Sequence, residues 1–160
     1  MRVVATSDTH TNSIQEFPIV LLDSLKNADM IIHAGDYTSK AVLDQLRKLG
    51  SFRGVHGNAD PPEIRLELPE IATFDLAGLR IGVTHPAEGG MPFRVQNRIR
   101  KRFEKVDLIV YGHTHNAKTE RKGELLFVNP GSPTRAWPAR AKTFAIIEIE
   151  QTIEARIVHV

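Results

Sequence analysis

The chain of 160 residues contains no cysteine, and only 6% of its residues are aromatic, with a single tryptophan. The lack of cysteine excludes disulfide bonds, thiolate metal sites and a cysteine nucleophile. Any metal site must therefore use imidazole, carboxylate and amide groups as ligands. The sequence also lacks an apolar run long enough to span a bilayer and the zones of a signal peptide. We accordingly expect a cytoplasmic protein that does not interact with membranes.

The rest of the composition is typical of a globular protein, with 41% hydrophobic and 25% charged residues. Chain length and composition together predict one domain over residues 1–160 that buries a substantial core. The formal net charge of +2 is mildly basic, and the isoelectric point is near 9.0. This charge is too weak to demand a nucleic-acid partner, and it is compatible with a phosphorylated substrate.

The first part of the chain alternates between strand and helix patterns. Short apolar runs at residues 2–6 and 30–34 predict buried strands, and apolar side chains at helical spacing predict a helix over 17–25. A second helix ends at Gly50, and a strand over 52–56 follows it. This alternation predicts a parallel sheet with right-handed crossovers.

Later segments favour antiparallel strands. Residues 71–76 and 79–83 flank Ala77-Gly78 like a hairpin, residues 107–111 form another predicted strand, and several more strands are expected between 118 and 160. A basic helix is predicted from about Pro92 to Lys105. Its cations are Arg94, Arg98, Arg100, Lys101, Arg102 and Lys105. We interpret this helix 94–105 as a solvated face rather than a nucleic-acid contact, because no aromatic residues are interleaved with its cations.

Polar side chains that can bind metals occur directly after five of the predicted strands. They are Asp8, His10, Asp36, Asn58, His85, His113 and His115. In open α/β sheets, ligands bind in the crevice at the carboxyl ends of the strands. This mixture of carboxylate, imidazole and amide suits Mn²⁺, Fe, Ni²⁺ or Zn²⁺. Asp36 is the candidate for a carboxylate that bridges two ions.

These residues stand in a set of ordered motifs. The motifs are Ser7-Asp8-Thr9-His10, Gly35-Asp36, Gly57-Asn58-Ala59-Asp60, Thr84-His85 and Gly112-His113-Thr114-His115. With them the chain resembles the calcineurin-like metallophosphoesterases, in particular their small single-domain bacterial and archaeal phosphodiesterase branch. The resemblance implies an α/β fold, a four-layer α/β/β/α sandwich of two mixed β-sheets flanked by helices. Asn129-Pro130-Gly131-Ser132 is similar to the turn that follows the last metal loop in this branch, although a plain tight turn is the preferred interpretation.

The resemblance also implies a site for two divalent metal ions, with Mn favoured and Ni, Zn, Fe or Mg as alternatives. One ion would be held by Asp8, His10, Asp36 and His115, and the other by Asp36, Asn58, His85 and His113. A hydroxide between the ions would be the nucleophile, so that no side-chain base is needed. Asn58, His85 and His10 would lie near the phosphate of a small phosphodiester substrate.

The chain departs from the family pattern at Ala59, where many members have a histidine. General-acid catalysis of the kind assigned to that histidine is worth roughly 10²–10⁴-fold in rate. We therefore expect phosphodiesters to be hydrolysed in preference to phosphomonoesters. Pro86 after His85 and Thr11 after His10 are further departures, which alter loop shape but remove no predicted ligand.

Two other functions are compatible with this pattern. The chain could be a non-catalytic metal-binding scaffold resembling a eukaryotic retromer subunit of the same fold, or a metal-dependent nuclease suggested by the basic helix. Catalysis on a small phosphodiester is preferred, because every predicted ligand position carries a coordinating residue and no additional capping domain is present. A homo-oligomer is compatible with the sequence, which does not identify the native metal or the physiological substrate.

Several further residues have a structural interpretation. Asp60 is expected to orient a metal ligand rather than to be one. His33 and His56 are expected inside strands as ordinary structural residues, and His159 as a plain strand residue. Trp137 is assigned either to the core or to an oligomer interface.

Overall fold

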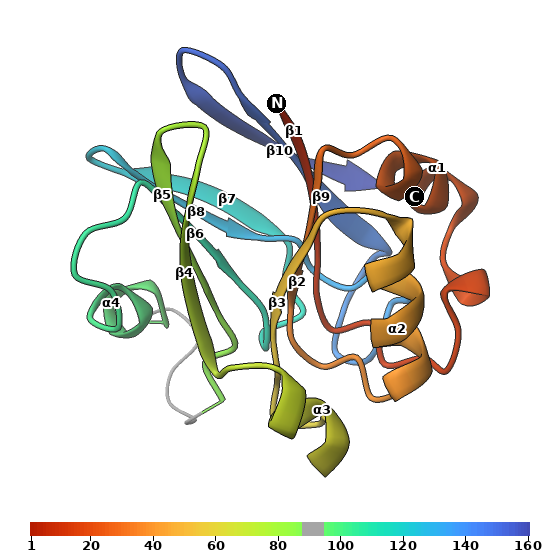
Figure 1. Ribbon diagram of the computed structural model, residues 1–160. Coiled ribbons are helices and arrows are strands. Elements are labelled where there is room, and N and C mark those ends of the chain that lie inside the picture. Colours follow the sequence, from red (N-terminus) through yellow and green to blue (C-terminus); the bar gives the residue numbers. More distant parts are fainter. Residues whose placement is uncertain (88–94) are drawn as a thin grey trace.

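The computed structural model describes residues 1–87 and 95–160, and these form an α/β fold (Figure 1). The strands are β1 (Arg2–Thr6), β2 (Met30–Ala34), β3 (Phe52–Val55), β4 (Ile71–Leu76), β5 (Leu79–Thr84), β6 (Leu108–Tyr111), β7 (Lys118–Lys122), β8 (Leu125–Asn129), β9 (Thr143–Ile149) and β10 (Ile153–His159). The helices are the 3₁₀ turn η1 (Ile14–Glu16), α1 (Ile19–Lys26), α2 (Lys40–Leu49), α3 (Pro62–Glu67) and α4 (Val95–Arg100).

Within these residues the strands form two five-stranded sheets, ordered β10-β9-β1-β2-β3 and β4-β5-β6-β8-β7. Strands β1, β2 and β3 run parallel, and β9 and β10 join them antiparallel. In the other sheet β5, β6 and β8 run parallel, while β4 and β7 are antiparallel edge strands. Both sheets are therefore mixed, as the family resemblance implies. The parallel strands expected from the first half of the chain are present, and the antiparallel strands β9 and β10 from the far end of the sequence extend their sheet.

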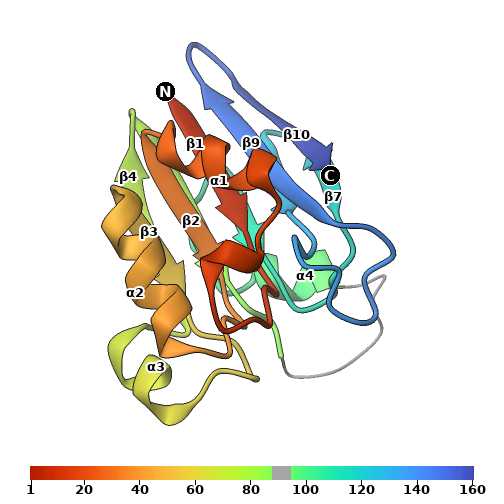
Figure 2. The ribbon, with the colours of Figure 1, turned by 90° about the vertical axis from the view of Figure 1, so that its right-hand side faces the viewer.

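Three apolar clusters separate four layers. The central cluster lies between the sheets and contains Val3, Ile32, Val83 and Val110 among others. A second cluster joins the first sheet to α1 and α2, which lie against the same face of that sheet (Figure 2). The third joins α4 to the second sheet. The predicted α/β/β/α sandwich is confirmed.

The burial pattern of the central strands explains why their sequences are mostly uninterrupted runs of apolar residues. In β1, Val3 faces the other sheet and Val4 faces the helices. In β2, Ile31 faces the helices and Ile32 the other sheet. Because side chains alternate between the faces of a strand and both faces are covered, apolar side chains are favoured at successive positions of these strands.

The structure corrects several predictions. The predicted basic helix ends at Arg100 rather than Lys105, and its first residues, Pro92 to Arg94, lie outside the described residues. His56 lies just beyond β3 rather than inside it. Trp137 is not a core residue, because 90% of its surface is exposed. Helix α3 and the turn η1 were not predicted.

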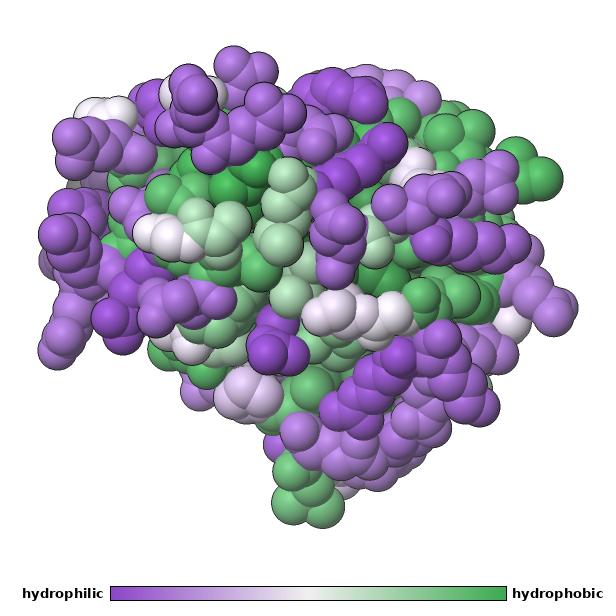
Figure 3. All heavy atoms as spheres, turned by 45° about the horizontal axis from the view of Figure 1, so that its top comes forward, coloured by the Kyte–Doolittle hydropathy of each residue, from purple (hydrophilic) through white to green (hydrophobic). Residues whose placement is uncertain are grey.

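A groove opens at the end of the sheets where β5, β6 and β8 begin. Its lining includes Asp107, Glu120, Glu124, Glu154 and the cation Arg121. Figure 3 tilts the top of Figure 1 toward the viewer and shows hydrophilic side chains over most of the visible face, with apolar ones between them. The excess of carboxylates disfavours an anionic substrate here. Among the described residues, no helix is long and apolar enough to cross a membrane.

Candidate metal centre

All seven predicted ligands lie in loops at the opposite end of the sheets from this groove. The loops after β1, β2 and β3 carry Asp8, His10, Asp36 and Asn58, and the loops after β5 and β6 carry His85, His113 and His115. Hydrogen bonds and close contacts connect these loops across the two sheets. The site therefore lies at the carboxyl ends of parallel strands from both sheets rather than of a single sheet.

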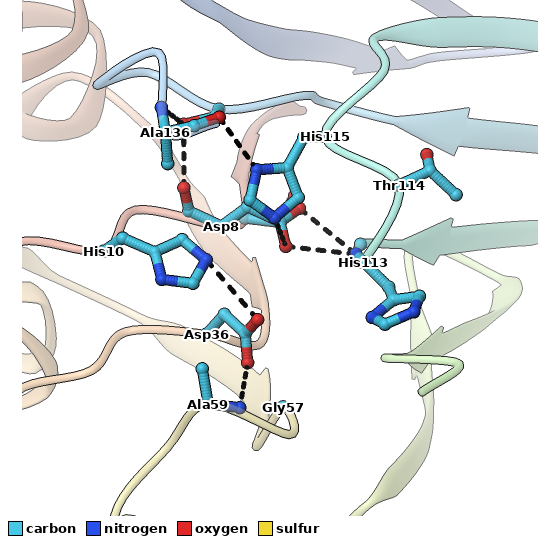
Figure 4. Close-up of polar contacts among 12 residues, drawn as sticks. Asp8, His10, Asp36, Gly57, Ala59, His113, Thr114, His115 and Ala136 are labelled. Atoms are coloured by element: carbon cyan, nitrogen blue, oxygen red, sulfur yellow. Dashed lines mark hydrogen bonds and ion pairs between the residues drawn. The ribbon is translucent and has the colours of Figure 1, made fainter. Parts of the chain in front are cut away.

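Four of these residues form a compact donor cluster, seen in Figure 4. One ligand atom from each of Asp8, His10, Asp36 and His115 lies within 4.8 Å of all the others. The Nε2 atom of His115 is 3.3 Å from Oδ1 of Asp8, and Nε2 of His10 is 3.4 Å from Oδ2 of Asp36. This is the ligand set that the family resemblance assigns to one metal ion.

The other predicted set converges on the side-chain oxygen of Asn58. Oδ1 of Asn58 is 3.2 Å from Nε2 of His85 and 3.0 Å from Nδ1 of His113. Nε2 of His85 also lies 3.4 Å from Oδ2 of Asp36. Oδ2 of Asp36 is thus equally close to one imidazole of each set, so Asp36 lies where the two sets meet.

Backbone carbonyls orient two of the imidazoles. Nδ1 of His85 donates to the carbonyl of Ala34 at 2.7 Å, and Nδ1 of His115 donates to the carbonyl of Ala136 at 3.0 Å. A carbonyl can only accept, so the ring proton is on Nδ1 and Nε2 of the neutral ring has a lone pair for a metal. Partners of this kind commonly orient metal-binding histidines.

The backbone at the site is unusual. Five of the seven predicted ligands have positive φ angles, namely Asp8 (51°), His10 (40°), Asp36 (61°), His113 (76°) and His115 (54°). This region is uncommon for residues other than glycine, and each such residue costs on the order of 1–3 kcal/mol. Strained residues of this kind cluster at functional sites, where the surrounding structure enforces them.

Asp60 holds part of this backbone in place through hydrogen bonds. Its carboxylate accepts hydrogen bonds from the backbone N–H groups of Asp36 (3.0 Å), Gly57 (2.7 Å) and Thr38 (2.8 Å). These N–H groups belong to the loops after β2 and β3, so the Asp60 carboxylate joins the two loops. Asp60 therefore orients the Asp36 loop, in agreement with the role expected from the sequence. The N–H of Ala59 adds a bond of 2.8 Å to Oδ1 of Asp36.

The segment 129–132 connects the remaining loops. Ser132 Oγ donates to the carbonyl of Asp8 at 2.8 Å, and Ser7 Oγ donates to the carbonyl of Gly131 at 2.9 Å. Asn129 Nδ2 donates to Oγ1 of Thr114 at 2.9 Å. This turn therefore supports the loops that carry Asp8 and His113, a role that goes beyond that of a plain tight turn.

The pKa values follow from burial and close imidazoles. Burial raises the pKa of Asp8, although the imidazoles of His85 and His115 act in the opposite direction. Burial also acts to raise the pKa of Asp36, but His10 and His85 outweigh it and hold this pKa below its ordinary value. The close approach of Asp36 raises the pKa of His10, whereas burial lowers that of His113. A bound cation would further favour the charged form of both carboxylates.

The donor atoms present fit divalent first-row ions. Asp8 and Asp36 are buried carboxylates, and buried charges require a partner or a metal. Nε2 of His10 is buried, and its contact at 3.4 Å with Oδ2 of Asp36 does not have the geometry of a hydrogen bond. Mixed imidazole, carboxylate and amide donors are the ligands preferred by Mn²⁺, Fe²⁺, Ni²⁺ and Zn²⁺.

The other histidines have structural surroundings. His33 is fully buried; its Nε2 lies 3.2 Å from Oγ1 of Thr9 and its Nδ1 accepts from the N–H of Gly35 at 3.2 Å. Its ring stacks on Tyr37, and burial holds its pKa well below the ordinary value. His159 lies in the edge strand β10. Neither belongs to the donor cluster.

Comparisons with known proteins define the class. Residues 1–152 match the model of the calcineurin-like phosphoesterase superfamily domain, and the chain belongs to this superfamily. A protein of Methanocaldococcus jannaschii described as a probable metallophosphoesterase is 32% identical over 99% of this chain and 81% of its own length. A phosphodiesterase of the same organism is 23% identical over 82% of this chain and 83% of its own.

Solved structures share the fold. The crystal structure of wild-type Vps29 from Entamoeba histolytica complexed with Zn²⁺ superposes with a TM-score of 0.72, covering 99% of each chain at 24% identity. Such a likeness defines the architecture. The metallophosphoesterase assignment follows from the family match and is consistent with the donor cluster of Asp8, His10, Asp36 and His115.

Proposed function

We propose that this metallophosphoesterase hydrolyses small phosphodiesters with two divalent ions bound by the seven ligands described above. The observation that carries the proposal is the position of Asp36 Oδ2, which is 3.4 Å from Nε2 of both His10 and His85. A carboxylate between two donor sets suits a pair of ions. The phosphodiesterase relative supports the substrate class.

In this proposal Asp8, His10, Asp36 and His115 would hold one ion, and Asp36, Asn58, His85 and His113 the other. Bound divalent ions would supply Lewis acidity that activates water and neutralises charge on the phosphoryl oxygens. The protein orients the donors: Ala34 and Ala136 hold the imidazole tautomers, and Asp60 holds the Asp36 backbone. Because Asn58 is exposed, it lies at the open side, where a substrate can approach.

The proposal is tested by turnover of bis-para-nitrophenyl phosphate with metal-stripped protein to which Mn²⁺, Ni²⁺, Zn²⁺ or Mg²⁺ is added back. We expect restored activity, highest with Mn²⁺, and faster turnover of this diester than of para-nitrophenyl phosphate. Equal rates for the two substrates would contradict the diester preference. Absence of activity with any metal, despite ions bound, would favour the scaffold alternative.

The diester preference is attributed to Ala59, and Ala59→His should weaken it. Ala59 is exposed and its N–H contacts Asp36, so a side chain added here borders the site. We expect turnover of phenyl phosphate, whose leaving group is poor, to rise about tenfold, toward the 10²–10⁴-fold of an established general acid. Ala59→Gln, which is polar but not an acid, is the matched control and should show no rise. An equal rise in both variants would assign the effect to binding rather than proton transfer.

A further inference from the structure

The chain's single tryptophan lies in the loop between β8 and β9 that borders the donor cluster. Trp137 exposes 90% of its surface, the highest value among the large hydrophobic residues in the described part of the chain. A single exposed apolar side chain is common on protein surfaces, but tryptophan has a large apolar face and is enriched at binding interfaces. Its place beside the donor cluster makes a role in binding worth testing.

This loop is fixed to the loop that carries Asp8. Ser132 Oγ donates to the carbonyl of Asp8 at 2.8 Å, and Thr134 Oγ1 donates to the carbonyl of Thr9 at 2.7 Å. The N–H of Ala136 donates to Ser132 Oγ at 2.9 Å. Trp137 therefore follows a turn, residues 132–136, that is hydrogen-bonded to the loop of Asp8.

The residue that precedes Trp137 contacts a predicted metal ligand. The carbonyl of Ala136, the preceding residue, accepts the Nδ1 proton of His115 at 3.0 Å, and Figure 4 shows Ala136 beside His115 and Asp8. A side chain attached to the next residue therefore starts at the border of the donor cluster. Contact with a substituent of a phosphodiester bound at the cluster is the use that this placement suggests for the exposed indole.

The charge of this loop favours an anionic ligand. Residues 132–142 contain Arg135, Arg140 and Lys142 and no carboxylate. Both arginines are exposed. Positive charge beside an aromatic face is the combination with which proteins bind nucleotides, because the cations attract phosphate and the ring stacks on the base.

We propose that Trp137 forms a subsite that stacks on a nucleobase in one arm of a phosphodiester substrate, with Arg135 and Arg140 contributing attraction to the anion. This inference rests on the proposed phosphodiesterase function and names its substrate class as nucleotide-type diesters. A phosphodiester has two organic arms, and one of them leaves during hydrolysis. The subsite would bind the arm that remains on the phosphate.

The first test is a binding measurement that needs no turnover. Because the chain has one tryptophan, its intrinsic fluorescence reports on Trp137 alone. Metal-loaded protein is titrated with adenosine 5′-monophosphate, and with ribose 5-phosphate and inorganic phosphate as controls. Excitation at the red edge of the indole band limits absorption by adenine. We expect saturable quenching by the nucleotide and little change with the two controls.

The second test uses two diesters with the same para-nitrophenyl leaving group, thymidine 5′-phosphate para-nitrophenyl ester and methyl para-nitrophenyl phosphate. Trp137→Ala should lower the ratio of kcat/KM for the nucleoside ester to that for the methyl ester by about tenfold, as expected for loss of one base–aromatic stack. Trp137→Phe should restore most of the ratio. Ile19→Ala, which also removes an exposed apolar side chain, should leave the ratio at its original value.

The two tests separate this inference from the proposed function. Quenching that is the same for nucleotide, sugar phosphate and phosphate, or is absent, would overturn the subsite even if diesters are hydrolysed. An unchanged kcat/KM ratio in Trp137→Ala would overturn it too. If no diester is hydrolysed at all, the proposed function fails, and the fluorescence titration still decides whether Trp137 binds a base.

Discussion

Asp36→Asn should lower kcat/KM for bis-para-nitrophenyl phosphate by about 10³-fold or more, a loss at the upper end of those caused by removing one electrostatic contact in an active site. The substitution keeps the size of the side chain and removes its charge. Asparagine has a single, uncharged oxygen, so it cannot both accept from the N–H of Ala59 and offer a charged oxygen 3.4 Å from His10 and His85. Because His10 and His85 hold the pKa of Asp36 low, the lost group is an ionised carboxylate at neutral pH.

The control for this prediction is His159→Ala. His159 is exposed at the end of the edge strand β10 and contacts none of the ligand loops in the described structure. Its removal should leave turnover unchanged, as measured on protein loaded with the same metal. Comparable losses in the two variants would mean that the activity does not depend on the Asp36 site.

Gly57→Ala should reduce kcat by about 10²-fold, because a displacement of about 1 Å at a reacting centre can have an effect of this size. A Cβ atom at Gly57 would lie 2.1 Å from Oδ1 and 2.6 Å from the backbone nitrogen of Asp36. The Asp36 backbone would have to move, and Asp60 could no longer accept from both N–H groups at 2.7 and 3.0 Å. Metal affinity should fall together with turnover.

The matched control is Gly50→Ala, at the end of α2. A Cβ atom at Gly50 meets nothing within 4 Å, and its φ of 161° is extended backbone that alanine also adopts. We expect normal turnover and metal affinity from this variant. Circular dichroism and thermal unfolding of both variants would distinguish a local displacement from a failure to fold. Full activity in a folded Gly57→Ala protein would show that the close contact at Asp36 does not govern the site.

Much of this arrangement was predictable from the sequence, because the strand pattern and the donor positions reinforce each other. Asp36 follows a short, mainly apolar run of five residues, which is typical of a central strand covered on both faces. The polar residues after this run are then expected at the carboxyl end of the sheet. The same argument places Asp8 after β1 and His113 after β6.

The end of α4 was not predictable in this way. Val95, Ile99 and Phe103 have helical spacing, and all three pack in the same cluster although the helix ends at Arg100. The ring of Phe103 lies against Gly82, where a Cβ atom would come within 2.6 Å of it. Tertiary packing therefore fixes the position of Phe103. For this reason the apolar spacing of Val95, Ile99 and Phe103 continues beyond the last residue of the helix.

The supporting contacts were also beyond sequence reasoning. The carbonyls of Ala34 and Ala136 orient His85 and His115, but a backbone carbonyl is present at every residue and leaves no mark in the sequence. The positive φ angles of the ligands arise from the hydrogen bonds between loops. The exposure of Trp137 likewise depends on how the loop is fixed to Asp8 and Thr9.

The central claim is that the seven ligands form two adjacent metal sites that share Asp36. It is tested most directly by electron paramagnetic resonance of manganese-loaded protein, with the bound metal counted by elemental analysis. We predict two manganese ions per chain and a spectrum of a magnetically coupled pair, which should be lost in Asp36→Asn. A single ion per chain, or two ions with uncoupled spectra, would contradict the shared site.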